Sequence, residues 1–286
     1  MKKTFLIALA ATALAAPAYA NHHGMSKAEH HKMHKEHSER LAKILADPAR
    51  GADAKRDQYR HPAETFEFFR LHPDHVIGEY APGGAWVSRI LGRYVNEKGK
   101  YTGLYFGTKS HFSDQQKAGI AANIAKFPAD VAAVSGRPAT DFNAFSLSEV
   151  PEGAKGSFDR IIVMRMLHNM MNWNIADSEI KAMRDLLKDD GLLGIEQHRA
   201  KADAPFSYTN GTKGYMREAD IIKFMEVNGF ELVAKSEINA NPKDSANWPD
   251  GVWTLPPALR LKDVDRAKYE AIGETDRMTL LFKKRP

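Results

Sequence analysis

The sequence predicts an α/β fold, a doubly wound and mainly parallel β-sheet covered by helices on both faces. From about residue 61 onward, short apolar runs alternate with amphipathic segments, which is typical of strands joined by helical crossovers. The 286-residue chain contains no cysteine, so a packed core rather than disulfides must stabilise it. We expect one domain over residues 55–286, preceded by a leader and a polar extension.

The first twenty residues have the features of a signal peptide. Lys2 and Lys3 form a basic start, residues 5–16 are apolar, and Ala18-Tyr19-Ala20 matches the small-residue pattern of a cleavage site. The apolar run is shorter than the roughly 20 residues that span a bilayer. We therefore expect cleavage after Ala20 and a periplasmic or secreted protein, with no membrane partner once the signal is removed.

A polar extension occupies residues 21–54, with six of the twelve histidines between His22 and His37. His30, His34 and His37 follow one another at i, i+4 and i+7, so a helix would place them on one face. Imidazoles at this spacing bind zinc, copper or nickel weakly when neither cysteine nor paired carboxylates accompany them. We expect a solvated extension with little fixed structure and no catalytic metal; a metal-buffering role is the alternative.

The first strand and helix of the domain frame a turn of small residues. Residues 75–80 form a short apolar strand, and the turn 81–84 reads Ala-Pro-Gly-Gly. A second strand, at 101–106, follows the turn at 98–100. Between the strands, apolar residues recur at i, i+3, i+4, i+7 and i+8, which predicts one buried face of a helix. They are Val87, Ile90, Leu91, Tyr94 and Val95.

The same alternation continues to the carboxyl end of the chain. A strand at 159–167 is centred on the apolar run 161–164, and a helix begins at Asp177 and ends at Gly191. Residues 248–259, rich in proline and tryptophan, are expected to form an ordered loop. The remaining expected elements are a helix at 218–228 and strands at 192–195, 230–234 and 278–282.

The turn after the first strand is the candidate cofactor-binding loop. Open parallel sheets bind ligands at the carboxyl ends of their strands, and small residues let the backbone approach a ligand closely. The helix N-terminus that follows favours electronegative groups, and an acid at the strand end suits a hydroxyl or ammonium donor. A tight turn without a ligand is the alternative from the residues alone. The candidate residues are Glu79, Ala81, Pro82, Gly83, Gly84 and Ala85.

Four motifs, in order, resemble those of class I S-adenosylmethionine-dependent methyltransferases. Residues 79–85 resemble the first motif, with two alanines where glycines are usual, and Ser157-Phe158-Asp159-Arg160-Ile161-Ile162 resembles the start of the fourth strand. Leu167-His168-Asn169 and residues 187–193 are similar to the motifs that follow it. The resemblance implies a Rossmann-like sheet of seven strands with an N-terminal helical extension, and S-adenosylmethionine as the cofactor.

Other stretches are similar to a bacterial group of predicted, often exported methyltransferases. Two positions depart from the wider family. The second strand ends in Leu104-Tyr105-Phe106-Gly107, without the acid that usually holds the ribose hydroxyls. The adenine-contacting Asp after the third strand has Asn143, or Asp141, as its best counterpart. The stretches that carry the narrower similarity are 60–65, 197–200, 235–244 and 273–278.

Polar residues follow the expected fourth and fifth strands. His168 is the candidate general base, and Arg165 and Asn169 are candidates for orienting an anionic or carbonyl-bearing acceptor. His198 and Arg199 lie at the equivalent edge of the next strand, where we expect them to converge with His168. A structural role is the alternative for each histidine. Lesser candidates for lining the pocket are Tyr59, His61, Glu64 and Glu237.

The sequence supports two functions. The first is an exported methyltransferase that transfers a methyl group from S-adenosylmethionine to a small-molecule acceptor, which the small-residue loop and His168-Asn169 favour. The second is a binding protein that kept the fold and lost the cofactor; the missing acid favours it, as does the cytoplasmic synthesis of the cofactor. The formal net charge of +5 is small and no basic stripe with interleaved aromatics is present, so we expect no nucleic-acid partner.

Overall fold

The computed structural model describes residues 27–83, 85–109 and 111–286, and the expected signal peptide lies outside these ranges. The chain divides into two units, Met1–Glu36 and His37–Pro286. In the first unit, the described residues form the first half of helix α1 (Lys27–Leu45), so the extension is helical there and not unstructured. Among the described residues, no helix combines the length and apolar character needed to cross a bilayer.

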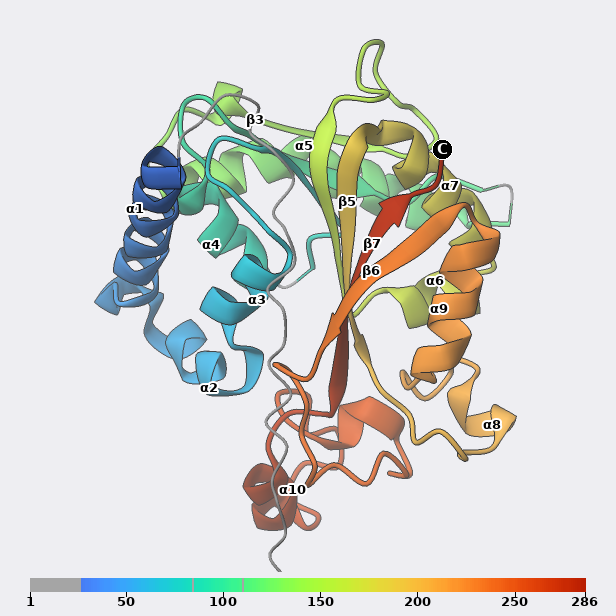
Figure 1. Cartoon of the computed structure of the whole chain (residues 1–286). Coiled ribbons are helices and arrows are strands. Elements are labelled where there is room, and N and C mark those ends of the chain that lie inside the picture. The colour runs from blue at the N-terminus through green and yellow to red at the C-terminus, as the bar shows by residue number, and fades with distance from the viewer. Residues whose placement is uncertain (1–26, 84, 110) are drawn as a thin grey trace, which may run out of the picture. The chain divides into compact units, whose positions relative to one another are not determined.

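The second unit contains a sheet of seven strands in the order β3-β2-β1-β4-β5-β7-β6 (Figure 1). Neighbouring strands from β3 to β5 are parallel, whereas β7 runs antiparallel to both β5 and β6. The expected doubly wound, mainly parallel sheet of seven strands is therefore confirmed. The strands are β1 (Val76–Tyr80), β2 (Lys100–Tyr105), β3 (Phe142–Ser146), β4 (Phe158–Met164), β5 (Leu187–His198), β6 (Phe230–Ser236) and β7 (Arg277–Lys284).

Helices cover both faces of the sheet because its central strands are apolar on both sides; Ile161, Ile162 and Val163 of β4 are all fully buried. Figure 1 shows α3 and α4 on one side of the sheet and α6, α7 and α9 on the other. Helix α5 packs against α4 and β3. The helices between α1 and the end of β6 are α2 (Asp57–Arg60), α3 (Pro62–Phe68), α4 (Trp86–Tyr94), α5 (Asp114–Ser135), α6 (Leu167–Asn172), α7 (Ala176–Leu186), α8 (Phe206–Thr209) and α9 (Glu218–Val227).

The end of α7 differs from the expectation that Gly191 stops this helix. The helix ends at Leu186, and β5 begins at Leu187. Gly191 lies inside the strand, where a Cβ atom would come within 2.9 Å of the Phe158 carbonyl oxygen. The pairing of β5 with β4 shifts register at this point, so the missing side chain of the glycine allows the two strands to lie close together.

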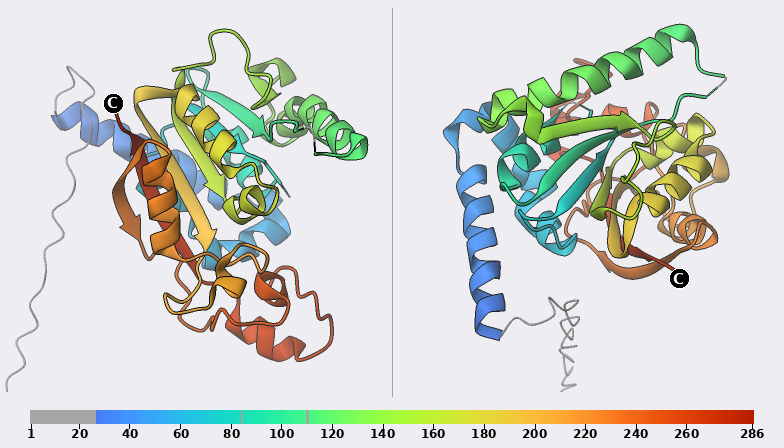
Figure 2. Two further views of the ribbon diagram at one scale, coloured as in Figure 1. Left: turned by 90° about the vertical axis from the view of Figure 1, so that its right-hand side faces the viewer. Right: turned by 90° about the horizontal axis from the view of Figure 1, so that it is seen from above.

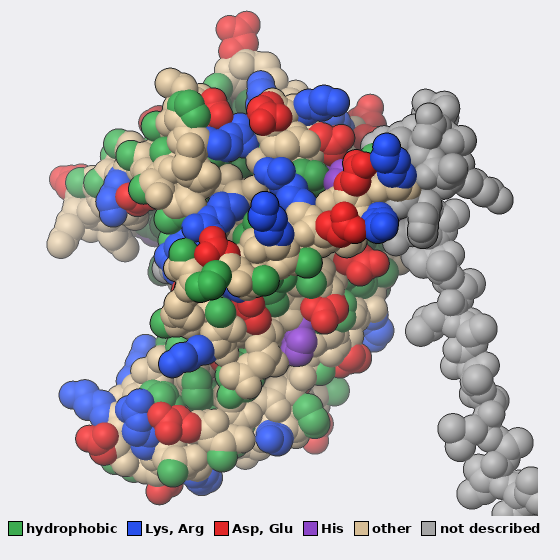
Figure 3. Space-filling model, turned by 90° about the vertical axis from the view of Figure 1, so that its left-hand side faces the viewer, with side chains coloured by type: hydrophobic (Ala, Val, Ile, Leu, Met, Phe, Trp, Pro, Cys, Tyr) green, Lys and Arg blue, Asp and Glu red, His purple; other side chains and the backbone are tan. Residues whose placement is uncertain are grey.

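A long connection between β6 and β7 extends past the carboxyl ends of the parallel strands, as the left view of Figure 2 shows in orange to red. It contains a 3₁₀ turn (Gly251–Thr254), a cis peptide bond between Pro256 and Pro257, and α10 (Arg266–Ile272). Leu255 and Thr254 are buried, so the expected ordered loop at 248–259 is confirmed. Figure 3 shows the molecule hollowed above the lower lobe, in which Figure 1 places α10.

The contact between β5 and the end of α3 gives a test of this packing. A Cβ atom at Gly194 would lie 2.6 Å from the ring of Phe69, which is buried. We expect Gly194→Ala to lower the free energy of unfolding by about 1–3 kcal/mol, because the ring has no space to move. Urea denaturation measures this change.

Gly119→Ala is the matched control, because Gly119 is exposed in α5 and nothing lies within 4 Å of an added Cβ there. This substitution is expected to stabilise the protein by up to about 1 kcal/mol through helix propensity. Equal effects of the two substitutions would contradict the packing described for Gly194.

Candidate functional site

A cavity of about 340 Å³ opens at the carboxyl edge of β1, β4 and β5, within the size range of small-molecule sites. Its lining joins the loop after β1 to the polar residues after β4 and β5, as the sequence predicts. The connection between β6 and β7 supplies a further wall that includes Trp253, Pro256 and Pro257. The expected site residues that line the cavity are Glu79, Ala81, Gly83, Arg165, His168, Asn169 and His198.

The loop after β1 adopts glycine-like backbone conformations without the usual glycines. Ala81 (φ 48°) and Ala85 (φ 54°) both lie in the left-handed region, which costs a non-glycine residue about 1–2 kcal/mol. Ala85 caps the N-terminus of α4, while Pro82 and Ala85 are not among the lining residues. A Cβ atom at Gly83 would have only the Ala81 carbonyl oxygen near it, at 3.5 Å. Gly84 lies outside the described residues.

The Glu79 carboxyl group is held from within the protein. It is 4% exposed and accepts hydrogen bonds from the Ser88 hydroxyl at 2.9 Å and from the Tyr101 hydroxyl. Burial raises the pKa of Glu79 to about 7, although these two hydrogen bonds oppose the shift. Glu79 is therefore only partly ionised near neutral pH, and its hydrogen-bond partners belong to the protein itself.

His168 is a neutral side chain whose orientation is fixed by Gln197. The Gln197 amide nitrogen donates to the Gly214 carbonyl oxygen at 2.8 Å and lies 3.2 Å from His168 Nδ1. We therefore assign Nδ1 as the acceptor and place the hydrogen on Nε2, which makes no hydrogen bond to a described residue. Burial lowers the pKa of His168 to about 4, so the ring suits hydrogen-bond donation better than proton removal at neutral pH.

His198 lies beside His168, as expected, with the two ring centroids 5.7 Å apart. Its Nδ1 is 2.6 Å from the Thr275 hydroxyl, and burial holds its pKa well below the usual range. Arg199 does not converge with them, because its guanidinium group pairs with Asp276 and Glu237 outside the cavity.

Sequence reasoning missed a group of buried ion pairs beneath the cavity. Glu274 accepts hydrogen bonds from Arg60 Nε at 2.8 Å and from Arg277 at 2.6 Å, while Glu196 pairs with Arg165 at 2.8 Å and Arg277 at 2.9 Å. Arg277 and Arg60 outweigh the effect of burial and lower the pKa of Glu274 to about 2. Three of these five charges lie in two stretches that are similar to the bacterial group, 60–65 and 273–278. That similarity was the only indication in the sequence that these charged residues matter.

The carboxyl ends of β1 and β2 are held together by hydrogen bonds to a glutamate that was not singled out from the sequence. Glu179 of α7, which is buried, accepts hydrogen bonds from the Gly107 amide at 3.1 Å and from the Tyr80 hydroxyl at 3.0 Å. No residue from 104 to 107 lines the cavity. The donors of Arg165 and His168 therefore lie in the cavity, whereas the end of β2 is occupied by hydrogen bonds within the protein.

The expectation that Asn143 follows the third strand is wrong. Asn143 is the second residue of β3, is exposed, and accepts a hydrogen bond from the Ala144 amide, so it lies outside the cavity lining. Asp141 pairs with Arg137 at the same edge. No range was assigned from the sequence to the third strand, which is β3 (Phe142–Ser146).

The lesser candidates also lie outside the cavity lining. The Tyr59 carbonyl oxygen accepts a hydrogen bond from Arg277, and Glu237 is an exposed partner of Arg199. His61 caps the N-terminus of α3 with a left-handed backbone, and Glu64 is exposed in the first turn of that helix. None of these four residues therefore lines the cavity.

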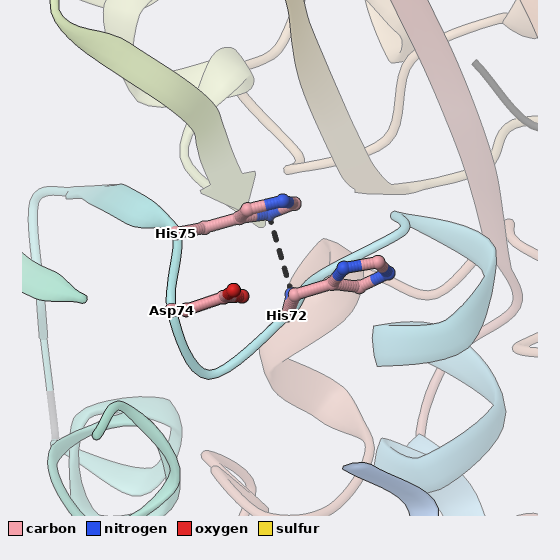
Figure 4. Close-up of side chains that lie close together, drawn as sticks. All are labelled: His72, Asp74 and His75. Carbon is pink, nitrogen blue, oxygen red and sulfur yellow. Dashed lines mark hydrogen bonds between the residues drawn. The ribbon is translucent and has the colours of Figure 1, made fainter. Parts of the chain in front are cut away.

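Side chains that resemble a metal site occur before β1, where the ligand atoms of His72, Asp74 and His75 lie within 4.8 Å of one another (Figure 4). The imidazole rings of His72 and His75 stack with centroids 4.6 Å apart, and His75 Nδ1 accepts a hydrogen bond from the His72 amide. Stacked rings with one nitrogen already bonded are typical of packing. His34 and His37 lie on α1, as does His30, whose side chain is outside the described part.

The buried Glu79 carboxyl group predicts a pH-dependent stability. Its pKa is raised from 4.5 to about 7, so the folded state binds this proton more tightly than the unfolded state does. The stability that this proton contributes is complete below pH 4.5 and is lost as the pH rises to about 7. Relative to wild type, Glu79→Gln is therefore expected to gain up to about 3 kcal/mol between pH 4.5 and pH 8.

Urea denaturation across this pH range measures the difference, and Glu152→Gln, at an exposed position, is the matched control. Parallel pH profiles for wild type and Glu79→Gln would mean that the carboxyl group titrates normally.

No protein-family model matches the sequence, and a comparison with curated protein sequences finds no match. Among solved structures, the [4+2]-cyclase SpnF superposes with a TM-score of 0.50 at 19% identity, covering 79% of this chain and 81% of that chain. A SAM-dependent methyltransferase from Aquifex aeolicus gives a TM-score of 0.48 at 12% identity, covering 85% and 97% of the two chains. These likenesses concern the fold: the chain has the seven-stranded α/β fold that its resemblance to class I methyltransferases implies.

Proposed function

We propose that this chain is an exported methyltransferase that uses S-adenosylmethionine to methylate a small molecule. One observation carries the proposal: Gly83 of the loop after β1 and the His168-Asn169 pair after β4 line the same cavity. This is the edge of the sheet at which doubly wound folds bind their ligands. The left-handed backbone of Ala81, which lines the cavity, supports the proposal, because such non-glycine residues are common at functional sites.

The side chains of the cavity suit binding and positioning. When bound, the cofactor supplies a methyl group on a sulfonium, which is already a good leaving group, so the protein mainly aligns and encloses the reactants. Arg165 and Asn169 orient the acceptor, and the Nε2–H of His168 donates a hydrogen bond to it. Trp253 and Pro256 reduce the access of water. An acceptor that loses its proton readily is favoured, since His168 is a weak base.

A second candidate function is a binding protein that kept the fold and lost the cofactor. The hydrogen bonds of Glu179 to Gly107 and Tyr80 favour it, because they occupy the end of β2, where the family usually binds ribose. In that function the cavity binds another small ligand, with the same arginine and histidine side chains. The two candidates differ in whether S-adenosylmethionine or its demethylated product binds.

Calorimetric titration of the chain that begins at Asn21 with S-adenosylhomocysteine separates the candidates. The methyltransferase is expected to bind it, and Gly83→Asp is expected to abolish binding, because an added carboxylate takes space and negative charge into the cavity. Gly119→Asp is the control, at an exposed position of α5 where nothing lies within 4 Å of an added Cβ and the backbone is helical. Absence of binding by the wild type would leave the binding-protein candidate, and unchanged binding by Gly83→Asp would remove this loop from the cofactor site.

We propose export from the basic start, the apolar run and the Ala18-Tyr19-Ala20 pattern. Expression of the full chain in a Gram-negative bacterium is expected to yield periplasmic or secreted protein that begins at Asn21. Amino-terminal sequencing of each cell fraction measures this. Substitution of Ala20 by Arg is expected to block cleavage, because a large charged residue replaces the small one at the cleavage site. Cytoplasmic protein that begins at Met1 would refute export.

A further inference from the structure

We propose that the cavity contains a binding site for an oxyanion, a carboxylate or phosphate group, formed by the guanidinium groups of Arg60 and Arg165 and the Nε2–H of His168. All three residues line the cavity. The site itself does not depend on a cofactor; only its assignment to the methyl acceptor rests on the proposed function.

Arg60 offers hydrogen-bond donors that the protein does not use. The side chain is 5% exposed, and both of its hydrogen bonds to Glu274 are made by Nε, at 2.8 and 3.0 Å. The two terminal nitrogens make no hydrogen bond to a described residue, and they are not among the fully enclosed atoms that lack a partner. They therefore reach the cavity, beside the Trp86 ring, which lies 5.0 Å from the guanidinium carbon. A planar pair of such donors matches a carboxylate or phosphate.

Arg165 provides the second group of donors. It directly follows β4 with a left-handed backbone (φ 59°), so its side chain reaches the cavity from the carboxyl edge of the sheet. One terminal nitrogen, Nη1, donates to Glu196 at 2.8 Å, whereas Nε and Nη2 make no hydrogen bond to a described residue. A left-handed backbone costs an arginine free energy, so the surrounding structure must hold Arg165 in this position.

The charges around the cavity do not balance. Four arginines have only two fully ionised glutamates as partners, and Glu79, with a pKa of about 7, offsets at most one further charge. Burial is the main cause that lowers the pKa of Arg60 to about 9, and the neighbouring Arg165 adds to this shift, while Glu274 opposes it. An anion in the cavity removes this penalty. The charges are those of Arg56, Arg60, Arg165, Arg277, Glu196 and Glu274.

His168 completes the donor set without adding charge. Its Nε2–H is available because Gln197 holds Nδ1 as an acceptor. Nearby, Met164, Met166, Trp86 and Trp253 give the cavity apolar walls. The ligand class that fits is therefore a small molecule with an anionic group on an apolar body.

Inorganic phosphate is the first probe, titrated calorimetrically into the chain that begins at Asn21 at pH 6.5 and constant ionic strength. We expect saturable binding at one site. Arg165→Gln and Arg60→Gln are expected to weaken it about tenfold or more, since each removes charge-assisted hydrogen bonds. Arg260→Gln is the matched control: Arg260 is exposed beside Trp253 and outside the lining, so its removal tests the effect of general positive charge.

Arg165→Lys covers the case in which a glutamine variant fails to fold, because it keeps the charge that pairs with Glu196 and loses the planar donors. It is expected to weaken phosphate binding at least about threefold while circular dichroism remains that of wild type. Absence of phosphate binding by the wild type would overturn the proposal. So would binding that Arg165→Lys and the folded glutamine variants leave unchanged, or that Arg260→Gln weakens equally.

A second titration, of S-adenosylhomocysteine in the presence of saturating phosphate, identifies the source of the anion. Simultaneous binding assigns the oxyanion site to the acceptor, and competition assigns it to the carboxylate of the cofactor; both outcomes keep the site. Phosphate binding without any binding of S-adenosylhomocysteine keeps the oxyanion site and rejects only the proposed methyltransferase. The two proposals therefore fail in different measurements.

Discussion

The buried ion pairs of Glu274 and Glu196 with three arginines are the interaction on which the site depends. They join Arg60, at the end of α2, to the start of β7, more than two hundred residues later in the chain, and to the carboxyl end of β5. Loss of one partner of a buried pair costs about 3–5 kcal/mol, because the other charge is left without compensation. Residues at the end of α2, before the sheet, therefore form a wall of the cavity. The ion pairs of Glu274 with Arg60 and Arg277 fix this wall to β7.

The sequence predicted the parts of the site that depend on backbone topology. Apolar runs and helical periodicity located β1 and β4, and the carboxyl ends of parallel strands lie at one edge. The meeting of Gly83 with His168 followed from that rule alone, without knowledge of any side-chain conformation. The apolar pattern predicted the last strand but not its direction, which is antiparallel to β5 and β6.

The parts that could not be predicted depend on side-chain direction and on exact strand boundaries. Arg60 and Glu274 are charged residues far apart in the sequence, and no periodicity indicates that both are buried. Glu179 is predicted to lie in the first turn of a helix, which is usually exposed. Its carboxylate instead accepts a hydrogen bond from the Gly107 amide, which follows β2. Asn143 was misplaced because no range for the third strand was assigned from the sequence, and β3 is only five residues long.

Two non-glycine residues with left-handed backbones, Ala81 and Arg165, line a cavity at which arginines outnumber ionised glutamates. Both features cost folding free energy, and neither contributes to the packing of the sheet. We therefore attribute the arginine donors that the protein leaves unused at this cavity to a ligand. Because the fold is shared with a cyclase, the chemistry follows from this cavity and not from the fold. A ligand that neutralises Arg60 and Arg165 accounts for the charge under either candidate function.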